Sequence, residues 1–227
     1  MYLEQNIRGL CDKFGLNFDS FLEELDVDHV NELSIYDLEA IAEEYVIDLN
    51  ALLFKNSFKS NHLKSRLENI KLLVLDVDGV MTDGGMYFTE SGDQFKKFNT
   101  KDGMGVELLL KNNIKTVLMT KENSMIVKKR GKKMNVAATY VNIKNKEQEL
   151  EKICKIFDVK KNEIAYIGDD LNDYNIITLV GFSATPANGI NQLKEIVNFI
   201  SKINGGDGVF REVADMILFA KNIKTNL

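Results

Sequence analysis

The sequence predicts an α/β fold, a doubly wound parallel sheet preceded by a small all-α module. A continuous apolar run of strand length occurs at Leu72–Leu75, with similar runs at 114–119 and Ile164–Ile167 and a weaker run at 181–184. Such runs are typical of parallel strands that are buried on both faces. Helical segments lie between them, and strands that alternate with helices form parallel sheets through right-handed crossovers.

Charge separates the N-terminal module from the rest of the chain. Residues 1–54 contain 13 acids and two bases, Arg8 and Lys13, and therefore carry −11. The whole chain of 227 residues carries −5, which leaves +6 on the remainder. We divide the chain into an acidic helical module (1–54), a polar and basic linker (55–69) and an α/β domain (70–227). The acidic module argues against nucleic acid as its partner, and the mildly basic domain suits an anionic ligand.

Local signals place the individual elements. In the module, Ser34 lies three residues before Asp37, a spacing that predicts a capping box at the start of a helix. In the domain, the expected helices are 103–112, 122–134, 146–157, 171–179 and 189–196. Residues 85–99 depart from this alternation, because two strand-like runs flank Ser91-Gly92-Asp93. They predict a β-hairpin between the first strand and the first helix of the domain.

The location expected for the protein is the cytoplasm, without membrane attachment. No apolar run approaches the roughly 20 residues that span a bilayer, and the N-terminus lacks the features of a secretory signal. Cys11 and Cys154 are far apart and match no metal-binding spacing. We expect them to be reduced thiols in packing roles.

Polar side chains gather where the predicted strands end. Asp76 and Asp78 follow the first strand, Thr120 ends the second, and Asp169 follows the strand at Ile164–Ile167. Ligands of open parallel sheets bind beyond the carboxyl ends of the strands, near the switch in strand order. We therefore expect these side chains to converge at one site.

The absence of histidine from the domain restricts its chemistry. His29 and His62 are the only two histidines and both precede the domain, which excludes a serine–histidine pair and a histidine metal cluster there. Several carboxylates at one point are costly unless a cation joins them. Oxygen ligands without histidine favour Mg²⁺ as the cofactor, with Asp169 as a ligand and Asp173 completing its water shell.

The spacing of the first two aspartates suits phosphoryl transfer. Asp76 can attack phosphorus and form an acyl phosphate. Asp78 can protonate the leaving oxygen and later deprotonate the attacking water. Gly79 permits a turn that a side chain would hinder, and the Thr120 hydroxyl and the Lys146 ammonium can hold phosphate oxygens.

Four motifs occur in the order that one known superfamily requires. DVDGVMTDG, LMTKEN, NKEQEL and GDDLND together resemble the motifs of the haloacid dehalogenase superfamily. MTDGGMYFTESGDQFKKFNTKDG and GGDGVFREVADMIL resemble its capless branch, which dephosphorylates 3-deoxy-ulosonate sugars. The resemblance covers about residues 70–220. It implies a Rossmann-like core with a hairpin insertion and no cap domain.

The resemblance also assigns roles to matching residues. It implies that Asp76 is the nucleophile, Asp78 the acid/base, and Thr120 and Lys146 the phosphate ligands. Asp76, the Asp78 carbonyl and Asp169 resemble the magnesium ligands. The family further implies a homotetramer, in which the hairpins form a central barrel and the glycine-rich C-terminal segment reaches a neighbour's active site.

Two substrates are open within this branch, a nononate 9-phosphate and 3-deoxy-D-manno-octulosonate 8-phosphate. Lys121 and Glu122 follow Thr120 where the octulosonate phosphatases have glycine and arginine, and Asp207 replaces an arginine of theirs. Glu122 and Lys133 instead resemble residues of the nononate (deaminoneuraminate, sialic-acid-like) phosphatases, where they contact the sugar. We therefore expect a nononate 9-phosphate, with the octulosonate 8-phosphate as the alternative.

Each candidate residue also has a purely structural interpretation. An Asp-x-Asp pair can form a polar turn, a lysine at position 146 can be solvated, and Asp173 can face solvent in a first helical turn. Glu122 and Lys133 can form a surface pair. Arg211 is either a substrate ligand or a salt-bridge partner near the C-terminus. Against these alternatives, we expect Gly79, Glu122, Lys133 and Arg211 to contact the substrate.

The N-terminal module resembles a Cro/repressor-type helix-turn-helix domain. The segments NIRGLCDKFGLNFDSFLEELDV and LSIYDLEAIAEEYVIDLNALLF carry this resemblance. The DHVNEL between them is much shorter than a recognition helix with its following loop. It also lacks basic residues, whereas phosphate contacts dominate DNA affinity. We expect a degenerate helical domain that packs or assembles. The alternative of another class is a regulator whose module binds DNA or protein while the domain senses a sugar phosphate.

Overall fold

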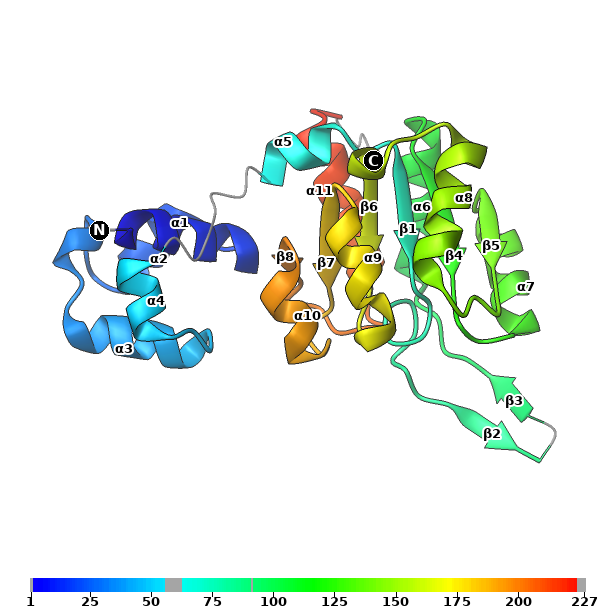
Figure 1. Ribbon diagram of the computed structural model, residues 1–227, viewed down its shortest axis with the longest axis horizontal. Helices are drawn as coiled ribbons and strands as arrows, with labels where there is room; N and C mark the ends of the chain where they lie inside the picture. Colours follow the sequence, from blue (N-terminus) through cyan, green and yellow to red (C-terminus); the bar gives the residue numbers. More distant parts are fainter. Residues whose placement is uncertain (1, 56–62, 91, 224–227) are drawn as a thin grey trace. The chain divides into compact units, whose positions relative to one another are not determined.

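The computed structural model describes residues 2–55, 63–90 and 92–223 (Figure 1). These residues form two compact units, one within residues 1–62 and one within residues 63–227. The predicted linker at 55–69 therefore contains the boundary between the units. Its last part forms helix α5 (Leu63–Glu68), whose Leu67 is buried in the core of the second unit.

The first unit is a small bundle of short helices. Its elements are α1 (Leu3–Phe14), α2 (Phe18–Glu24), the 3₁₀ helix η1 (Val30–Glu32), α3 (Ile35–Glu44) and α4 (Leu49–Phe54). Side chains such as Ile7, Leu10 and Leu52 are fully buried in its core. The predicted capping box is confirmed, because the Ser34 side chain accepts a bond from the Asp37 N–H and Asp37 bonds back to the Ser34 N–H. The likeness to a helix-turn-helix domain stays a prediction.

The second unit is built on a parallel sheet, as predicted, and the sheet has six strands. Its strands are β1 (Leu72–Leu75), β4 (Lys115–Met119), β5 (Ala138–Tyr140), β6 (Ile164–Ile167), β7 (Phe182–Thr185) and β8 (Phe199–Ile200). They lie in the order β5-β4-β1-β6-β7-β8, and every neighbouring pair is parallel. The first strand of the unit therefore lies at the centre of the sheet. The chain first builds outward through β4 and β5 and then returns to the other side of β1.

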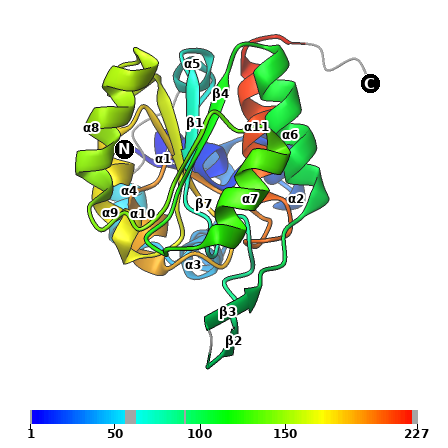
Figure 2. The same cartoon turned by 90° about the vertical axis from the view of Figure 1, so that its right-hand side faces the viewer.

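Helices cover both faces of this sheet (Figure 2). The helices are α6 (Thr100–Lys111), α7 (Met125–Met134), α8 (Lys146–Phe157), α9 (Tyr174–Leu179), α10 (Asn191–Ile196) and α11 (Val209–Ala220), with 3₁₀ turns η2 (Lys161–Glu163) and η3 (Leu171–Asp173). Helices α6, α7 and α11 pack on one face, and α8, α9 and α10 lie on the other. Asn99, Ser124 and Asn145 cap three of these helices with their side-chain oxygens.

The predicted hairpin is present and extends beyond the carboxyl ends of the strands (Figures 1 and 2). Strands β2 (Tyr87–Thr89) and β3 (Gly92–Phe95) pair antiparallel, while Ser91 lies outside the described residues. The Tyr87 and Phe95 rings stack with centroids 4.2 Å apart, and both remain more than half exposed. In the described part of the chain, the hairpin replaces a cap domain between β1 and α6.

Some elements were missed or misplaced by the sequence argument. The edge strands β5 and β8 have only three and two residues, too few for a clear pattern. Helix α11 was not predicted. Helix α7 begins at Met125, later than expected, because Ser124 caps it. Among the described residues, every helix is too short or too polar to cross a membrane.

Candidate active site

The site lies at the switch in strand order, as expected. Asp76 directly follows the central strand β1, and its N–H donates to the Ile167 carbonyl of β6. Thr120 follows β4 on one side of β1, and Asp169 follows β6 on the other. Because the connections after β1 and β5 lead to opposite sides of β1, the loops diverge here and leave room for a ligand.

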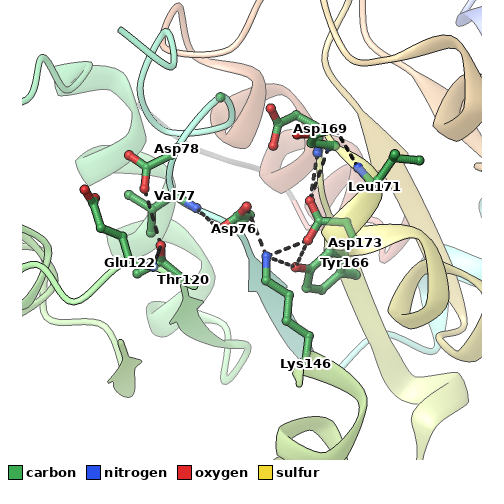
Figure 3. A network of polar contacts seen from close by, with 12 residues as sticks. Asp76, Val77, Asp78, Thr120, Glu122, Lys146, Tyr166, Asp169, Leu171 and Asp173 are labelled. Carbon is green, nitrogen blue, oxygen red and sulfur yellow. Dashed lines mark hydrogen bonds and ion pairs between the residues drawn. The ribbon is translucent and has the colours of Figure 1, made fainter. Parts of the chain in front are cut away.

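A cavity of about 410 Å³ opens at this point. It is lined by Asp76, Asp78, Gly79, Gly84, Met86, Thr120, Lys121, Glu122, Asp169, Asp170 and Asn172. Two groups of side chains surround it. We call Asp76, Lys146, Tyr166, Asp169 and Asp173 the inner cluster, and Asp78, Lys96, Thr120 and Glu122 the outer cluster. Figure 3 shows members of both around the end of β1.

The inner cluster is centred on the Lys146 ammonium. Its Nζ lies 3.0 Å from Asp76 Oδ2 and 2.6 Å from Asp173 Oδ1, and it donates to the Tyr166 hydroxyl at 3.1 Å. Lys146 is the first residue of α8, yet its side chain is only 3% exposed. Burial favours its neutral amine, but the two carboxylates outweigh burial and raise the pKa of Lys146. The alternative interpretation of Lys146 as a solvated surface lysine is therefore excluded.

Asp173 is held by donors on both of its oxygens. Its Oδ1 accepts from the Tyr166 hydroxyl at 2.6 Å as well as from Lys146. Its Oδ2 accepts from the N–H groups of Asp169 at 3.0 Å and Asp170 at 3.5 Å. Asp173 is fully buried and does not face solvent. Its contacts fix the loop that carries Asp169 (Figure 3).

Three carboxylates of the inner cluster form a group that fits a metal ion. One oxygen from each of Asp76, Asp169 and Asp173 lies within 4.8 Å of the others. Burial first, and then repulsion by Asp173, raises the pKa of Asp76 to about 7. Burial, followed by the charges of Asp76 and Asp173, raises the pKa of Asp169 to about 8. One lysine thus leaves the cluster with excess negative charge, which a divalent cation would neutralise.

Gly79 gives the loop after β1 its close approach to this group. Its φ is +83°, and a Cβ there would lie 1.9 Å from Asp169 Oδ2. The glycine-rich C-terminal segment, which includes Gly205 and Gly206, packs against the same loop. A Cβ on Gly205 would lie 1.8 Å from the Gly79 carbonyl oxygen, and the Gly206 N–H donates to the Val80 carbonyl at 2.9 Å. This segment therefore packs against the active-site loop of its own protomer.

The outer cluster places a second ammonium between two carboxylates. Lys96 Nζ lies 2.7 Å from Asp78 Oδ1 and 2.6 Å from Glu122 Oε2. The Thr120 hydroxyl donates to Asp78 Oδ2 at 3.3 Å and accepts from the Glu122 N–H at 3.1 Å. Burial disfavours the charged ammonium, but the bonds to Asp78 and Glu122 raise the pKa of Lys96 above its usual range.

Sequence reasoning missed two members of these clusters, Lys96 and Tyr166. A hydroxyl inside the buried strand β6 was a usable signal, because a buried tyrosine needs a partner for its O–H. Lys96 had no comparable signal. It follows β3 in a run of polar residues, and only the folded chain brings it to Asp78.

Two predicted substrate contacts lie away from the cavity of their own protomer. Lys133 is exposed in the last turn of α7 and lines a separate cavity with residues of α6. The expected helix 122–134 would have placed Glu122 and Lys133 in one helix, but Glu122 precedes the cap of α7 and lies outside it. Arg211 lines a third cavity and pairs with Asp215, whose oxygens both lie 2.9 Å from its Nε. The salt-bridge alternative thus describes Arg211 in the protomer.

Comparisons with known proteins agree with this fold. A family model for haloacid dehalogenase-like hydrolases matches residues 110–213. The 3-deoxy-D-manno-octulosonate 8-phosphate phosphatase of Salmonella typhi is 33% identical over 162 residues, which cover 71% of this chain and 86% of that protein. The crystal structure of the Yersinia pestis enzyme of the same name gives a TM-score of 0.70 at 31% identity, over 72% of this chain and 88% of that one.

A further solved relative contains ligands. The Moraxella catarrhalis 3-deoxy-D-manno-octulosonate 8-phosphate phosphatase was crystallised with magnesium, phosphate and the sugar acid. It gives a TM-score of 0.69 at 30% identity and covers 72% of this chain and 94% of that one.

The fold and the carboxylate site define a haloacid dehalogenase-like hydrolase, and the chain belongs to this family. Within the family it falls in the capless branch with the octulosonate phosphatases. The predicted enzyme class, a phosphomonoester hydrolase that depends on Mg²⁺, is confirmed.

Proposed function

We propose that the protein hydrolyses 3-deoxy-D-manno-octulosonate 8-phosphate to the free sugar acid and inorganic phosphate. The observation that carries this proposal is the match over most of the length of the octulosonate phosphatases, combined with a cavity that opens onto Asp76. This choice reverses the preference drawn from Glu122 and Lys133, since Lys133 lies outside that cavity.

The first half of the proposed reaction transfers the phosphoryl group to Asp76. A carboxylate oxygen of Asp76 attacks phosphorus, the bond from phosphorus to the sugar oxygen breaks, and Asp78 gives its proton to that oxygen. Thr120 and Lys146 hold phosphate oxygens during the transfer. Lys146 is already fixed by Asp76 and Asp173, so its charge is in place before substrate binds.

The second half releases phosphate. A water molecule attacks phosphorus and gives a proton to Asp78, and the acyl phosphate bond breaks to restore Asp76. Mg²⁺ would be held by Asp76, the Asp78 carbonyl and Asp169, and it would neutralise the charge of the phosphoryl oxygens. In the described residues, the Asp169 side chain makes no hydrogen bond or ion pair, so it is available as a ligand. Asp173 acts by orienting Lys146 and the Asp169 loop.

A nononate 9-phosphate is the second candidate substrate. The observation in its favour is the position of Glu122, which lines the cavity beside Thr120. A carboxylate there can accept hydrogen bonds from sugar hydroxyls. Lys133 and Arg211 can contribute only to the site of a neighbouring subunit.

A direct test compares phosphate release from the two sugar acid phosphates under the same conditions. We expect kcat/KM with Mg²⁺ to be higher for the octulosonate 8-phosphate, and we expect activity to disappear when a chelator removes the metal. A higher kcat/KM for the nononate 9-phosphate would reverse the choice of substrate. Activity that persists without a divalent metal would contradict the proposed mechanism.

We also propose that the enzyme acts in the cytoplasm as a homotetramer joined through the hairpin and residues 204–212. The exposed, stacked rings of Tyr87 and Phe95 support this, together with the exposed Met86. Exposed apolar groups of this kind are typical of interfaces. Light scattering at micromolar concentration should give the mass of four chains, and a fully active monomer would contradict the assembly.

A further inference from the structure

The Lys96 ammonium joins two loops of the active site. Lys96 directly follows the hairpin strand β3, whereas Asp78 follows β1 and Glu122 follows β4. Its side chain is 1% exposed, and its Nζ lies within 2.7 Å of both carboxylates. A lysine this deeply buried is rare unless its charge is paired. The hairpin therefore delivers a charged group to the two loops on the outer side of the cavity.

The contacts of Lys96 determine how the Asp78 carboxylate is oriented. Lys96 holds Oδ1, and the Thr120 hydroxyl lies 3.3 Å from Oδ2. With both oxygens contacted, rotation of the Asp78 side chain is restricted, and Oδ2 stays beside the residue that we propose to hold phosphate. Figure 3 shows Asp78 and Glu122 next to each other above Thr120.

The charge of Lys96 also separates two groups that repel each other. Asp78 and Glu122 each have an oxygen bound to the same ammonium, so these oxygens are close together. Two negative charges a few ångströms apart repel strongly near a protein interior. Without the ammonium, the lowest-energy response is rotation of one carboxylate away from the other. Rotation of Asp78 would move its proton-transfer oxygen out of line with the substrate.

We propose that Lys96 is a positioning residue, which holds Asp78 in the orientation needed for proton transfer to the leaving oxygen. The inference rests on the proposed function, because it takes Asp78 to be the acid/base. Lys96 itself does not touch the reacting atoms in this role. Its effect should therefore be large only when the leaving group needs a proton.

The test compares two leaving groups in a single turnover. A simple alkyl phosphate releases a strongly basic oxygen that must be protonated, whereas 4-nitrophenyl phosphate releases a stable phenolate without help. In Lys96→Met, we expect the rate of alcohol release to fall about 10- to 100-fold, the size of effect that small misplacement of a reacting group produces. Phenolate release should change by less than about 3-fold, because proton donation contributes little to it.

Two further variants control for charge and folding. Lys97→Met removes the adjacent lysine, which is exposed and lies 3.8 Å from Asp83, and both rates should stay as in the parent protein. Lys96→Arg keeps the positive charge and should recover most of the alcohol release. If Lys96→Met fails to fold, the double variant Lys96→Met/Glu122→Gln removes the repulsion but still lacks the Lys96 contact to Asp78 Oδ1. It should show a smaller loss that is still selective for the alkyl ester.

The outcomes separate the inference from the proposed function. Equal losses with both esters would mean that Lys96 only supports the fold, and rates like those of Lys97→Met would mean that it has no role. Either result overturns the inference while the phosphatase mechanism stands. Full activity in Asp76→Asn, or an inactive parent protein, would overturn both.

Discussion

The inner and outer clusters use the same arrangement in different surroundings. Each places one buried ammonium between two carboxylates, Lys146 between Asp76 and Asp173, and Lys96 between Asp78 and Glu122. The carboxylates of Asp76 and Asp173 are almost completely buried, whereas the side chains of Asp78 and Glu122 are 32% and 29% exposed. The inner group contains a third carboxylate near its lysine, which leaves it short of positive charge.

This difference matches two tasks of the proposed reaction: the attack on phosphorus by Asp76 in the inner cluster, and proton transfer by Asp78 in the outer cluster. The inner cluster comes from strand ends and helix starts that the core holds rigidly, so its charges are fixed before substrate arrives. The outer cluster is assembled from two loops and the residue after a hairpin, and solvent reaches it. A change inside the inner cluster should therefore abolish the reaction, and a change in the outer cluster should slow it to a degree that depends on the substrate.

The largest effect is expected from Asp76→Asn, which removes the attacking oxygen but keeps the size of the side chain. We expect kcat to fall by at least about 10⁴-fold, as for loss of a nucleophile. The metal-free variant should melt at the same temperature as the parent or higher, because one of three clustered charges is gone. Steady-state turnover measures the fall in kcat, and a thermal melt without metal measures the melting temperature. A variant that is inactive because its melting temperature collapses would not support the role.

The next largest effect is expected from Asp78→Asn, which tests the outer cluster. The variant should lose about 10²–10⁴-fold in kcat on an alkyl phosphate, the usual contribution of a general acid–base group. Rapid mixing should show slower formation and slower breakdown of the acyl phosphate. Asp83→Asn is a matched control, because Asp83 follows in the same loop and its side chain is 47% exposed. Unchanged rates in Asp78→Asn would assign the acid/base role to another group.

Much of the inner cluster could be predicted from sequence, because its residues belong to regular elements. Asp76 directly follows an apolar run and Asp169 follows another after one glycine, and the geometry of a parallel sheet brings such positions together. Lys146 starts a predicted helix whose boundaries 146–157 were correct. The central strands were also found, since buried parallel strands are continuous apolar runs. The same reasoning failed at β5 and β8, which are too short to show a pattern.

The outer cluster could not be predicted, because long-range packing sets it. Nothing in the order of residues relates Lys96 to Asp78, 18 positions earlier; only the folded hairpin returns the chain to the site at Lys96. The start of α7 after Ser124 also changed where Glu122 and Lys133 lie relative to each other. A spacing of eleven residues places two side chains on one helix face only if both lie in the helix, and Glu122 does not.

A smaller effect is expected from Glu122→Ala, with Lys133→Ala as its comparison. Glu122 lines the cavity and Lys133 does not, so only Glu122→Ala should lower kcat/KM in a protomer that acts alone. Loss of a charged hydrogen bond to a sugar hydroxyl costs about 1.5–3 kcal/mol, or about 10- to 150-fold. A small phosphate ester should show less change. An equal loss for Lys133→Ala, seen only on the sugar substrate, would place Lys133 in a neighbour's site.

The smallest effect concerns the pH dependence of stability in the inner cluster. The folded-state pKa values of Asp76 and Asp169 are raised to about 7 and about 8, above their ordinary value of 3.8. Their protonated forms therefore stabilise the metal-free fold. This contribution is fully present below the unfolded pKa and is lost as pH rises through the folded values. Between about pH 4 and about pH 8, the metal-free protein should therefore become less stable.

Magnesium should reverse this trend, because it binds the charged carboxylates and competes with protons. We expect the rise in melting temperature on adding Mg²⁺ to be larger at about pH 9 than at about pH 6, by at least about 2–4 °C, the shift that 1 kcal/mol produces in a chain of this size. Asp169→Asn should remove most of the difference, whereas Asp78→Asn should retain it because its metal ligand is a carbonyl. A rise that is independent of pH would mean that the inner carboxylates are already charged without metal. The two clusters would then differ in burial and in the elements that carry them, but not in the protonation of their carboxylates.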